Sequence, residues 1–353
     1  MPELLLQETS PYATRRASLL RGEGDLYLYL EDLVSQTPMT TSAVWVGNYL
    51  PAPTDRSVEA PRGTPPRMGA GGTRFPEGCP DLGRAMSLVW FEEGDAVAIV
   101  DAEGVLAAIP GWAGRSDFYG YSRYARGRTG LAWELTRDAN AALEAKVIES
   151  REFWAWRGAG AWGEVRTTGL GHLEARTGPQ EAAWPLGQAQ FPELIATRHR
   201  IGELPVWVTA TTGLSAQRMA GVEQYVDQPE RAGRIELAIA RSMPDQAGAE
   251  LLSSLATIPF GRCTWLGEGH TVGGSPGNYP AYGADKAAVL LTANPPAGSR
   301  YPMPDLQGLR RRGEPVTYLW VMVIDEETFR LARGRDARAA LAHLQVNGAT
   351  WVQ

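Results

Sequence analysis

The sequence contains little of the side-chain chemistry on which many enzymes depend. Its 353 residues include two cysteines and four histidines, and of its 34 basic residues only Lys146 and Lys286 are lysines. Two cysteines cannot build a disulfide framework, and without a C-x-x-C pair there is no cysteine-rich zinc site. The histidines are scattered, no H-E-x-x-H occurs, and neither lysine stands in a P-loop. We therefore expect no metal and no cofactor.

Long apolar runs and an excess of basic residues are also missing. The longest apolar stretch, Val316 to Ile324, is broken only by Thr317 and has the length of a strand, whereas a membrane helix needs about 20 residues. The first residues lack the basic region and the apolar segment of a signal peptide. The net charge is −6, which argues against a nucleic-acid partner. These features predict a cytoplasmic protein that binds neither nucleic acid nor membrane.

The N-terminal half is rich in strand signals. Tight glycine turns separate its apolar runs, which predicts an antiparallel meander in the second group of strands. The expected strands are 25–30, 43–49, 86–91, 95–100, 105–109 and 131–135. A helix is expected after them, capped by Asp138 and ended by Gly158. The glycine-rich stretch 158–187 is interpreted as irregular.

The C-terminal half alternates between strand and helix patterns. Two near-continuous apolar strands, 287–292 and 316–324, should be central and buried on both faces. The other expected elements are a short helix at 191–200, strands at 206–212 and 234–241, a helix at 246–257, and two last helices capped by Asp325 and Asp336. Together the two halves predict an α+β fold of two mixed domains. We expect a strand-rich domain at 1–160 that ends in a helix, a linker at 161–186, and a second domain at 187–353.

Two short motifs do not fit the structures that they would need. The G-x-G-x-x-G at Gly158–Gly163 follows a helix, whereas a dinucleotide fingerprint follows a strand. The G-x-S-x-G at Gly273–Gly277 resembles a nucleophile elbow, but the residue after its serine is Pro276. An elbow uses the backbone N–H of that residue for the oxyanion hole, and proline has none. A helix stop and a turn-forming loop explain these glycines better.

Two loops supply the candidate binding residues, and no catalytic residue is assigned. The first is the long glycine-rich loop Gly261–Gly283, with Trp265, Glu268, His270, Tyr279 and Tyr282. Its glutamate and histidine could act as an acid–base pair, or the histidine could fix the loop by bonding its backbone. The second loop, 112–128, has the tyrosine, tryptophan and arginine typical of binding hot spots, or its rings are buried against the meander. The candidates there are Trp112, Tyr119, Tyr121 and Arg123.

Five segments of the C-terminal half carry a family resemblance. They are V-T-A-T-T-G-L-S at 208–215, R-I-E-L-A-I-A at 234–240, T-W-L-G-E-G-H-T at 264–271, A-V-L-L-T at 288–292 with Pro295 and Pro296, and the strand 316–324 with D-E-E after it. In this order they resemble the suppressor of fused domain family, over roughly Gly187 to Leu344. The sequence departs from the family at Val323 and Gly273, where proline is usual.

The resemblance implies a mixed sheet with flanking helices and a non-enzymatic protein-binding function. The animal member of the family sequesters a transcription factor by gripping an extended peptide, and bacterial members are often proposed as immunity proteins that neutralise toxins. Abundant Ala, Gly, Pro and Arg hint at a bacterial source. The expected partner is thus a basic toxin or an extended peptide, bound at the 261–283 loop or in a cleft between the domains. The alternatives are a hydrolase that uses Glu268 and His270, or small-molecule binding at the 112–128 loop.

Overall fold

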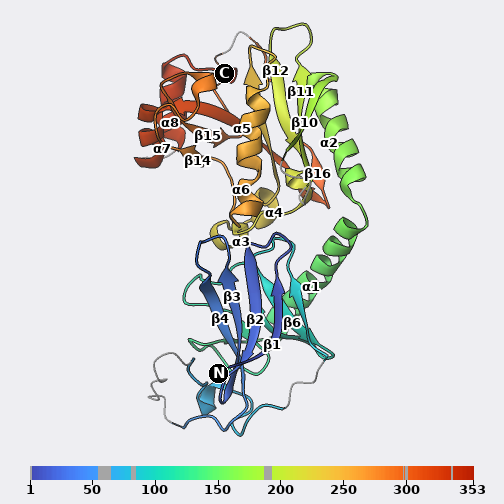
Figure 1. The fold of residues 1–353 in the computed structure, drawn as a ribbon, viewed down its shortest axis with the longest axis vertical. Helices are drawn as coiled ribbons and strands as arrows, with labels where there is room; N and C mark the ends of the chain where they lie inside the picture. Colours follow the sequence, from blue (N-terminus) through green and yellow to red (C-terminus); the bar gives the residue numbers. More distant parts are fainter. Residues whose placement is uncertain are drawn as a thin grey trace. The chain divides into compact units, whose positions relative to one another are not determined.

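The computed structural model divides the chain into two compact units (Figure 1). It describes residues 2–54, 65–80, 85–186, 193–296, 298, 301–334 and 337–353. Unit 1 is Met1–Ala159 with two later segments, Ala220–Asp227 and Phe260–Cys263, and unit 2 is the remainder. Residues 187–192, where the second domain was expected to begin, lie outside the described residues.

The first sheet of unit 1 is an antiparallel meander of four strands. Its strands are β1 (Glu3–Thr9), β2 (Arg15–Arg21), β3 (Asp25–Asp32) and β4 (Met39–Asn48). Strands β3 and β4 confirm the prediction, whereas β1 and β2 were not predicted. Strand β2 has arginines at both ends, and only Ala17, Ser18 and Leu19 at its centre are buried, so it lacks a long alternating pattern.

The second sheet of unit 1 contains the predicted meander. Its strands, in spatial order, are β5 (Ser87–Trp90), β6 (Val97–Asp101), β7 (Gly104–Ile109), β8 (Tyr121–Ser122) and β9 (Trp133–Glu134). Helix α1 (Arg137–Gly158) packs on this sheet through Leu143 and Val147. Thr136 caps it, accepting from the amide of Ala139 at 3.3 Å. The prediction that Asp138 is the cap was therefore wrong, because the helix begins at Arg137, two residues earlier than a cap at Asp138 would allow.

Unit 2 is built on a seven-stranded mixed sheet (Figure 1). Its strands, in spatial order, are β10 (Gln180–Leu186), β11 (Leu194–Arg200), β12 (Trp207–Thr212), β13 (Ile235–Arg241), β18 (Thr317–Asp325), β15 (Lys286–Thr292) and β14 (Thr271–Gly273). Strands β13 and β18 are parallel and the other neighbours antiparallel. The apolar strands β15 and β18 lie inside the sheet and are buried, as predicted. The α+β class is thus confirmed.

Helices cover both faces of this sheet. Gly169 of α2 (Trp162–Thr177) lies against Thr212, and Gly248 of α5 (Ala247–Ala256) lies against Thr209. Since residues three apart in a strand point to opposite faces, the two helices pack on opposite sides of β12. Helices α7 (Glu326–Gly334) and α8 (Ala337–Val346) form a smaller core with β15 and β18.

The helix caps and short elements complete the described chain. Asp325 caps α7, accepting from the Thr328 amide at 2.8 Å, as expected, while Asp336 lies outside the described residues. The short elements are η1 (Ala70–Gly72), η2 (Leu214–Ala216), α3 (Val222–Tyr225), α4 (Pro229–Ala232), α6 (Ile258–Gly261), η3 (Pro280–Tyr282) and the hairpin β16 (Arg310–Arg311) with β17 (Glu314–Pro315). None of the helices in the described part of the chain combines the length and apolar character of a membrane span.

Two secondary-structure predictions were wrong. The stretch 158–187 was expected to be irregular, yet it contains α2 and β10. Its glycines hid the helix, but Gly169 is required there because a Cβ would lie 2.5 Å from Thr212 Cγ2. The expected helix at 191–200 is instead strand β11, whose Leu194, Ala196 and His199 are buried between neighbouring strands.

Candidate functional site

The sequence motifs of unit 2 meet at one buried carboxylate. Glu236 of β13 is fully buried. Its carboxylate accepts hydrogen bonds from the hydroxyls of Thr211 and Ser215, both at 2.6 Å, and from the amides of Gly213 at 3.0 Å and Ser215 at 3.1 Å. Four donors compensate the desolvation of this carboxylate. The T-T-G-L-S turn and the R-I-E-L strand are thus one structural unit.

A second buried network lies beside it. The Arg234 guanidinium donates to the carbonyls of Ser215 and Ala216, each at 3.2 Å, and to the Glu314 carboxylate at 2.7 Å. Arg218 also donates to Glu314, at 2.9 Å through Nε. Burial alone would raise the pKa of Glu314, but the bonds and charges of Arg218 and Arg234 hold it below its ordinary value. These charges thus bind one another and the nearby backbone.

The loop that carries Glu268 and His270 is tied to strand β15. The Gly269 amide donates to the Leu291 carbonyl at 2.8 Å, and the Leu291 amide donates to the His270 carbonyl at 2.9 Å. The His270 ring lies 4.3 Å from the Trp265 ring and also bonds the Trp265 backbone. Burial lowers the pKa of His270 despite that bond. These contacts favour the interpretation in which the histidine fixes the shape of the loop.

Glu268 points to partners other than His270. Its carboxylate accepts from the Thr292 hydroxyl at 2.7 Å and from the Ala293 amide. An acid–base pair must share a reacting proton through direct contact or one water. Here Glu268 bonds Thr292 and the Ala293 amide, whereas His270 bonds the Trp265 backbone. The geometry thus favours a structural role for both residues over the hydrolase alternative.

The two candidate tyrosines of the same loop are half-buried. Tyr279 donates its hydroxyl to the Val272 carbonyl at 3.0 Å. The Arg241 guanidinium lies 4.4 Å from the centre of the Tyr282 ring, and burial raises the pKa of Tyr282 to about 12. Tyr279 thus packs on its own loop and Tyr282 on Arg241 of β13, and the longest exposed run of the loop is 275–278.

The candidates of the 112–128 loop pack mainly on the second sheet of unit 1. Arg123 binds Asp101 through two nitrogens, at 3.0 and 2.9 Å, and Glu103 at 3.0 Å. Tyr121 is half-buried, 4.7 Å from the Phe118 ring. Trp112 is also half-buried, packed against the core of this sheet. Tyr119 differs from them, with 41% of its surface exposed.

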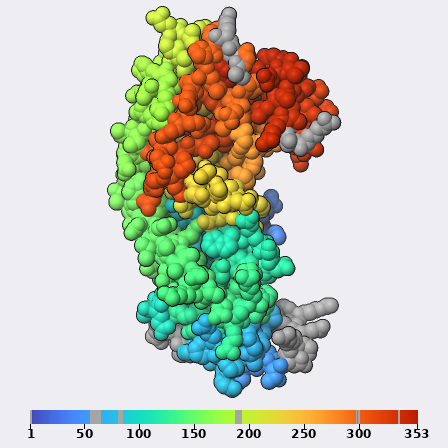
Figure 2. Space-filling model, turned by 180° about the vertical axis from the view of Figure 1, so that it is seen from behind, coloured from blue at the N-terminus to red at the C-terminus, as the bar shows by residue number. Residues whose placement is uncertain are grey.

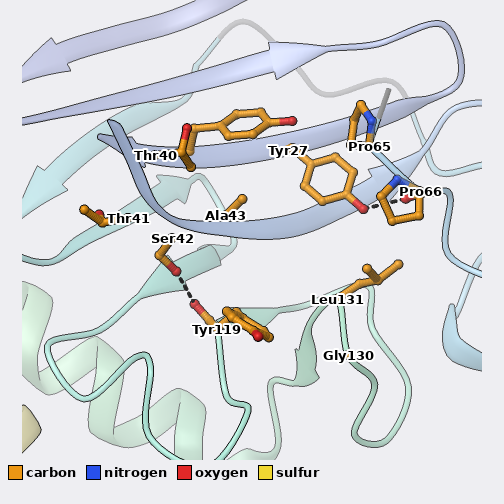
Figure 3. Close-up of a pocket in the computed structure, with 11 residues that line it drawn as sticks. Tyr27, Thr40, Thr41, Ser42, Ala43, Pro65, Pro66, Tyr119, Gly130 and Leu131 are labelled. Atoms are coloured by element: carbon orange, nitrogen blue, oxygen red, sulfur yellow. Dashed lines mark hydrogen bonds between the residues drawn. The ribbon is translucent and has the colours of Figure 1, made fainter. Parts of the chain in front are cut away.

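Tyr119 borders an open groove of about 560 Å³ in unit 1 (Figure 3). The groove is lined by Tyr27 and Tyr29 of β3, residues 40–43 of β4, Pro65, Pro66, Tyr119, Gly130 and Leu131. The Ser42 hydroxyl donates to the Tyr119 carbonyl at 3.1 Å across it. Tyr119 is the one residue of the 112–128 loop in this lining. A small-molecule site is usually a more enclosed cavity, so the groove is better suited to a macromolecular surface.

A cluster of charged residues in unit 1 was missed by the sequence analysis. Lys146 of α1 lies 3.2 Å from Glu93 and also binds Glu223 of α3, while Asp95 accepts from the Gly221 amide at 2.5 Å. Burial, followed by the charge of Glu93, raises the pKa of Asp95 to about 6 and that of Glu223 to about 7. The sequence feature that could have drawn attention to this cluster is Lys146 itself, one of only two lysines among 34 basic residues. No group of acidic, histidine or cysteine residues in the described ranges could hold a metal.

Comparison with known families decides the nature of the C-terminal half. Residues 195–352 match the family model described as Suppressor of fused protein (SUFU). This segment is a suppressor of fused domain. The family comprises non-catalytic protein-interaction modules, and the matched range includes Glu236, Arg234 and the loop at His270. A search of curated proteins found no match to the chain. Within the suppressor of fused domain, the motifs at 208–215 and 234–240 thus coincide with the buried networks at Glu236 and Arg234.

Proposed function

We propose that this protein is a non-enzymatic binding protein whose partner is another protein. The observation that carries the proposal is the suppressor of fused domain at residues 195–352. Its motif residues build the scaffold, so binding specificity must come from the exposed surface around them. The most concrete form of the proposal is an immunity protein that neutralises a toxin, and the second form is a regulatory scaffold that binds an extended peptide.

The partners of the reactive side chains support a non-enzymatic role. His172 bonds the Leu306 carbonyl at 2.7 Å, and His199 lies between the Gly178 carbonyl and the Thr197 hydroxyl, each at 2.9 Å. Lys286 pairs with Asp285 at 3.1 Å. Histidines and lysines held in this way are poorly placed for acid–base or nucleophilic catalysis.

The charge of the chain supports a basic partner. A net charge of −6 favours encounter with a positively charged protein and disfavours acidic ones. Such steering acts mainly on the association rate and weakens with added salt. A basic toxin, such as a nuclease, therefore fits the first form of the proposal better than an acidic one does.

A binding experiment with the full chain tests the proposal. Proteins retained from lysates of the source organism and of its competitors are identified, and each one is titrated against the chain in purified form. We expect a protein that forms a stoichiometric complex, whose association slows as salt rises and whose toxic activity the chain suppresses. If a synthetic peptide from the partner binds as tightly as the whole partner does, the scaffold form replaces the immunity form. The proposal is wrong if no retained protein binds in purified form.

Two exposed surfaces can then be compared by substitution. Tyr119→Ala removes the exposed ring of the unit 1 groove, and Ser275→Arg places a long side chain on the exposed stretch of the 261–283 loop. Met243→Ala is the control, because this methionine is 57% exposed and lies outside the groove, the 261–283 loop and residues 220–227. We expect about a tenfold or greater loss of affinity from one of the two variants and none from the control. Unchanged binding in both would exclude both surfaces.

A further inference from the structure

One part of the suppressor of fused domain sequence folds into unit 1. Residues 220–227, which include α3, belong to the matched range 195–352 but to unit 1 in the structure. Two acidic side chains of unit 1 bind a single lysine there, and a third acid lies near them and binds the start of α3. Glu93 and Asp95 come from the turn between β5 and β6, Lys146 from α1, and Glu223 from α3 itself. The yellow surface in Figure 2 contains this segment.

Polar contacts within this cluster attach the segment. Lys146 bridges Glu93 of the turn and Glu223 of the segment, and Asp95 accepts from the Gly221 amide at the start of α3. The side chains of Lys146 and Glu223 are each only 12% exposed, and that of Glu93 only 1%. The attachment thus depends on ionisable groups that are largely removed from water.

The buried charges do not balance when every acid is ionised. Two carboxylates would then bind one ammonium group with a third carboxylate nearby, and like charges in a site of low dielectric cannot all persist at low cost. Other charged groups near the cluster include Arg15 of β2, which acts on Asp95, and Arg115, which donates to the Glu223 carbonyl at 3.4 Å and pairs with Asp227 at 3.5 Å. Cys263 also lies near Asp95, but burial raises its pKa to about 12, so it stays a neutral thiol.

We propose that these four residues form a proton-sensitive clasp that holds residues 220–227 on unit 1 and loosens as the pH rises. The clasp is tightest when the cluster keeps protons on its acids. Deprotonation adds negative charge beside Glu93 and weakens the hold on α3. The clasp gives a protein-binding domain a means of altering its own surface in response to acidity.

The direction of the effect follows from linkage. Burial raises the pKa of Asp95 from 3.8 to about 6 and the pKa of Glu223 from 4.5 to about 7. Between the ordinary and the raised values, the attached state holds protons that the detached state has lost. Attachment is therefore strongest below about pH 4, weakens through the interval up to about pH 7, and changes little above it.

Hydrogen exchange of the full chain tests the clasp. Three backbone amides serve as reporters. The Gly221 amide donates to Asp95, and the amides of Gln224 and Val226 donate to carbonyls at the start of the same segment. Protection factors, corrected for the intrinsic exchange rate at each pH, are measured from pH 5 to pH 8. We expect reporter protection to fall about tenfold or more over this range, and the amides of β6 and β7 to change less than about threefold. Constant reporter protection overturns the proposal.

Variants separate the clasp from a general effect of pH. Asp95→Asn with Glu223→Gln removes the titrating acids and keeps their size, so the reporters should stay protected at pH 8. Glu149→Gln is the matched control, because Glu149 is an exposed acid of α1, and it should keep the wild-type profile. If the double variant does not fold, Glu223→Gln alone should flatten the profile in part. The proposal is overturned if the double variant or Glu223→Gln folds and its reporter protection still depends on pH as in the wild type.

Discussion

Replacing Glu236 by alanine should be the most damaging single change to unit 2. The substitution removes the acceptor of four hydrogen bonds, two from hydroxyls and two from the amides of Gly213 and Ser215. The side chain is fully buried, so water cannot easily replace it. The hydroxyls can rotate to other acceptors, since Thr211 already lies 3.5 Å from the Leu237 carbonyl. The two amides have no such freedom.

The expected cost follows from those two amides. A buried donor without a partner costs about 1–3 kcal/mol, so the pair accounts for about 4 kcal/mol. Such a loss is a large part of the roughly 5–15 kcal/mol that stabilises a typical domain. Glu236→Gln keeps one acceptor oxygen and the shape of the side chain, so it should cost about 1–2 kcal/mol.

Native-state hydrogen exchange is the suitable assay, because the chain has two units and a single melting curve would mix them. The opening free energy of the slowest amides in β13 and β18 reports on unit 2 alone. Glu203→Ala is the control, since this glutamate is exposed in the turn between β11 and β12 and should change the free energy by less than about 0.5 kcal/mol. A loss below about 1 kcal/mol for Glu236→Ala would refute the reasoning.

Two further predictions concern a glycine and a cysteine. Gly213→Ala should lower the stability of unit 2 by about 2 kcal/mol or more, because φ is +115° and a Cβ would lie 2.4 Å from the Glu193 carbonyl oxygen; the same exchange assay measures it, and a neutral effect would contradict the strained turn. Cys263 should react with iodoacetamide at pH 8 about a thousandfold more slowly than an ordinary thiol, since burial raises its pKa to about 12. Mass spectrometry of the timed reaction measures that rate, and labelling as fast as free cysteine would show that the thiol is accessible.

Strong local patterns allowed much of the fold to be predicted. The meander of β5, β6 and β7 was found because glycine turns such as Gly94 and Gly104, at positive φ, separate its apolar runs. Strands β15 and β18 were found because an apolar run needs cover on both faces. The predictions of secondary structure failed where tertiary packing outweighs the local preference of the residues for helix or strand. Helix α2 keeps Gly169 for a close approach to Thr212, and the Arg/His-rich end of β11 gives no strand signal of its own.

The sequence indicated less about the surroundings of the candidate residues than about the fold. The sequence singled out Trp265, Glu268 and His270 as a compact group, and the structure ties all three to nearby backbone, rings or threonine. Hydrogen-bond partners from distant strands cannot be read from residue spacing. For the same reason the cluster at Lys146 was missed, because Glu93 and Glu223 lie 53 and 77 residues away from it in the chain.

The sequence by itself indicated the family of residues 195–352. Ordered motifs such as T-T-G-L-S and R-I-E-L carry the resemblance to the suppressor of fused domain. Only the tertiary structure decided what those residues do. It showed Glu236 as the acceptor that joins the two motifs, and it placed residues 220–227 in unit 1 beside an excess of buried acid. Burial and long-range pairing set the energy of each charge, and both arise only when the chain has folded.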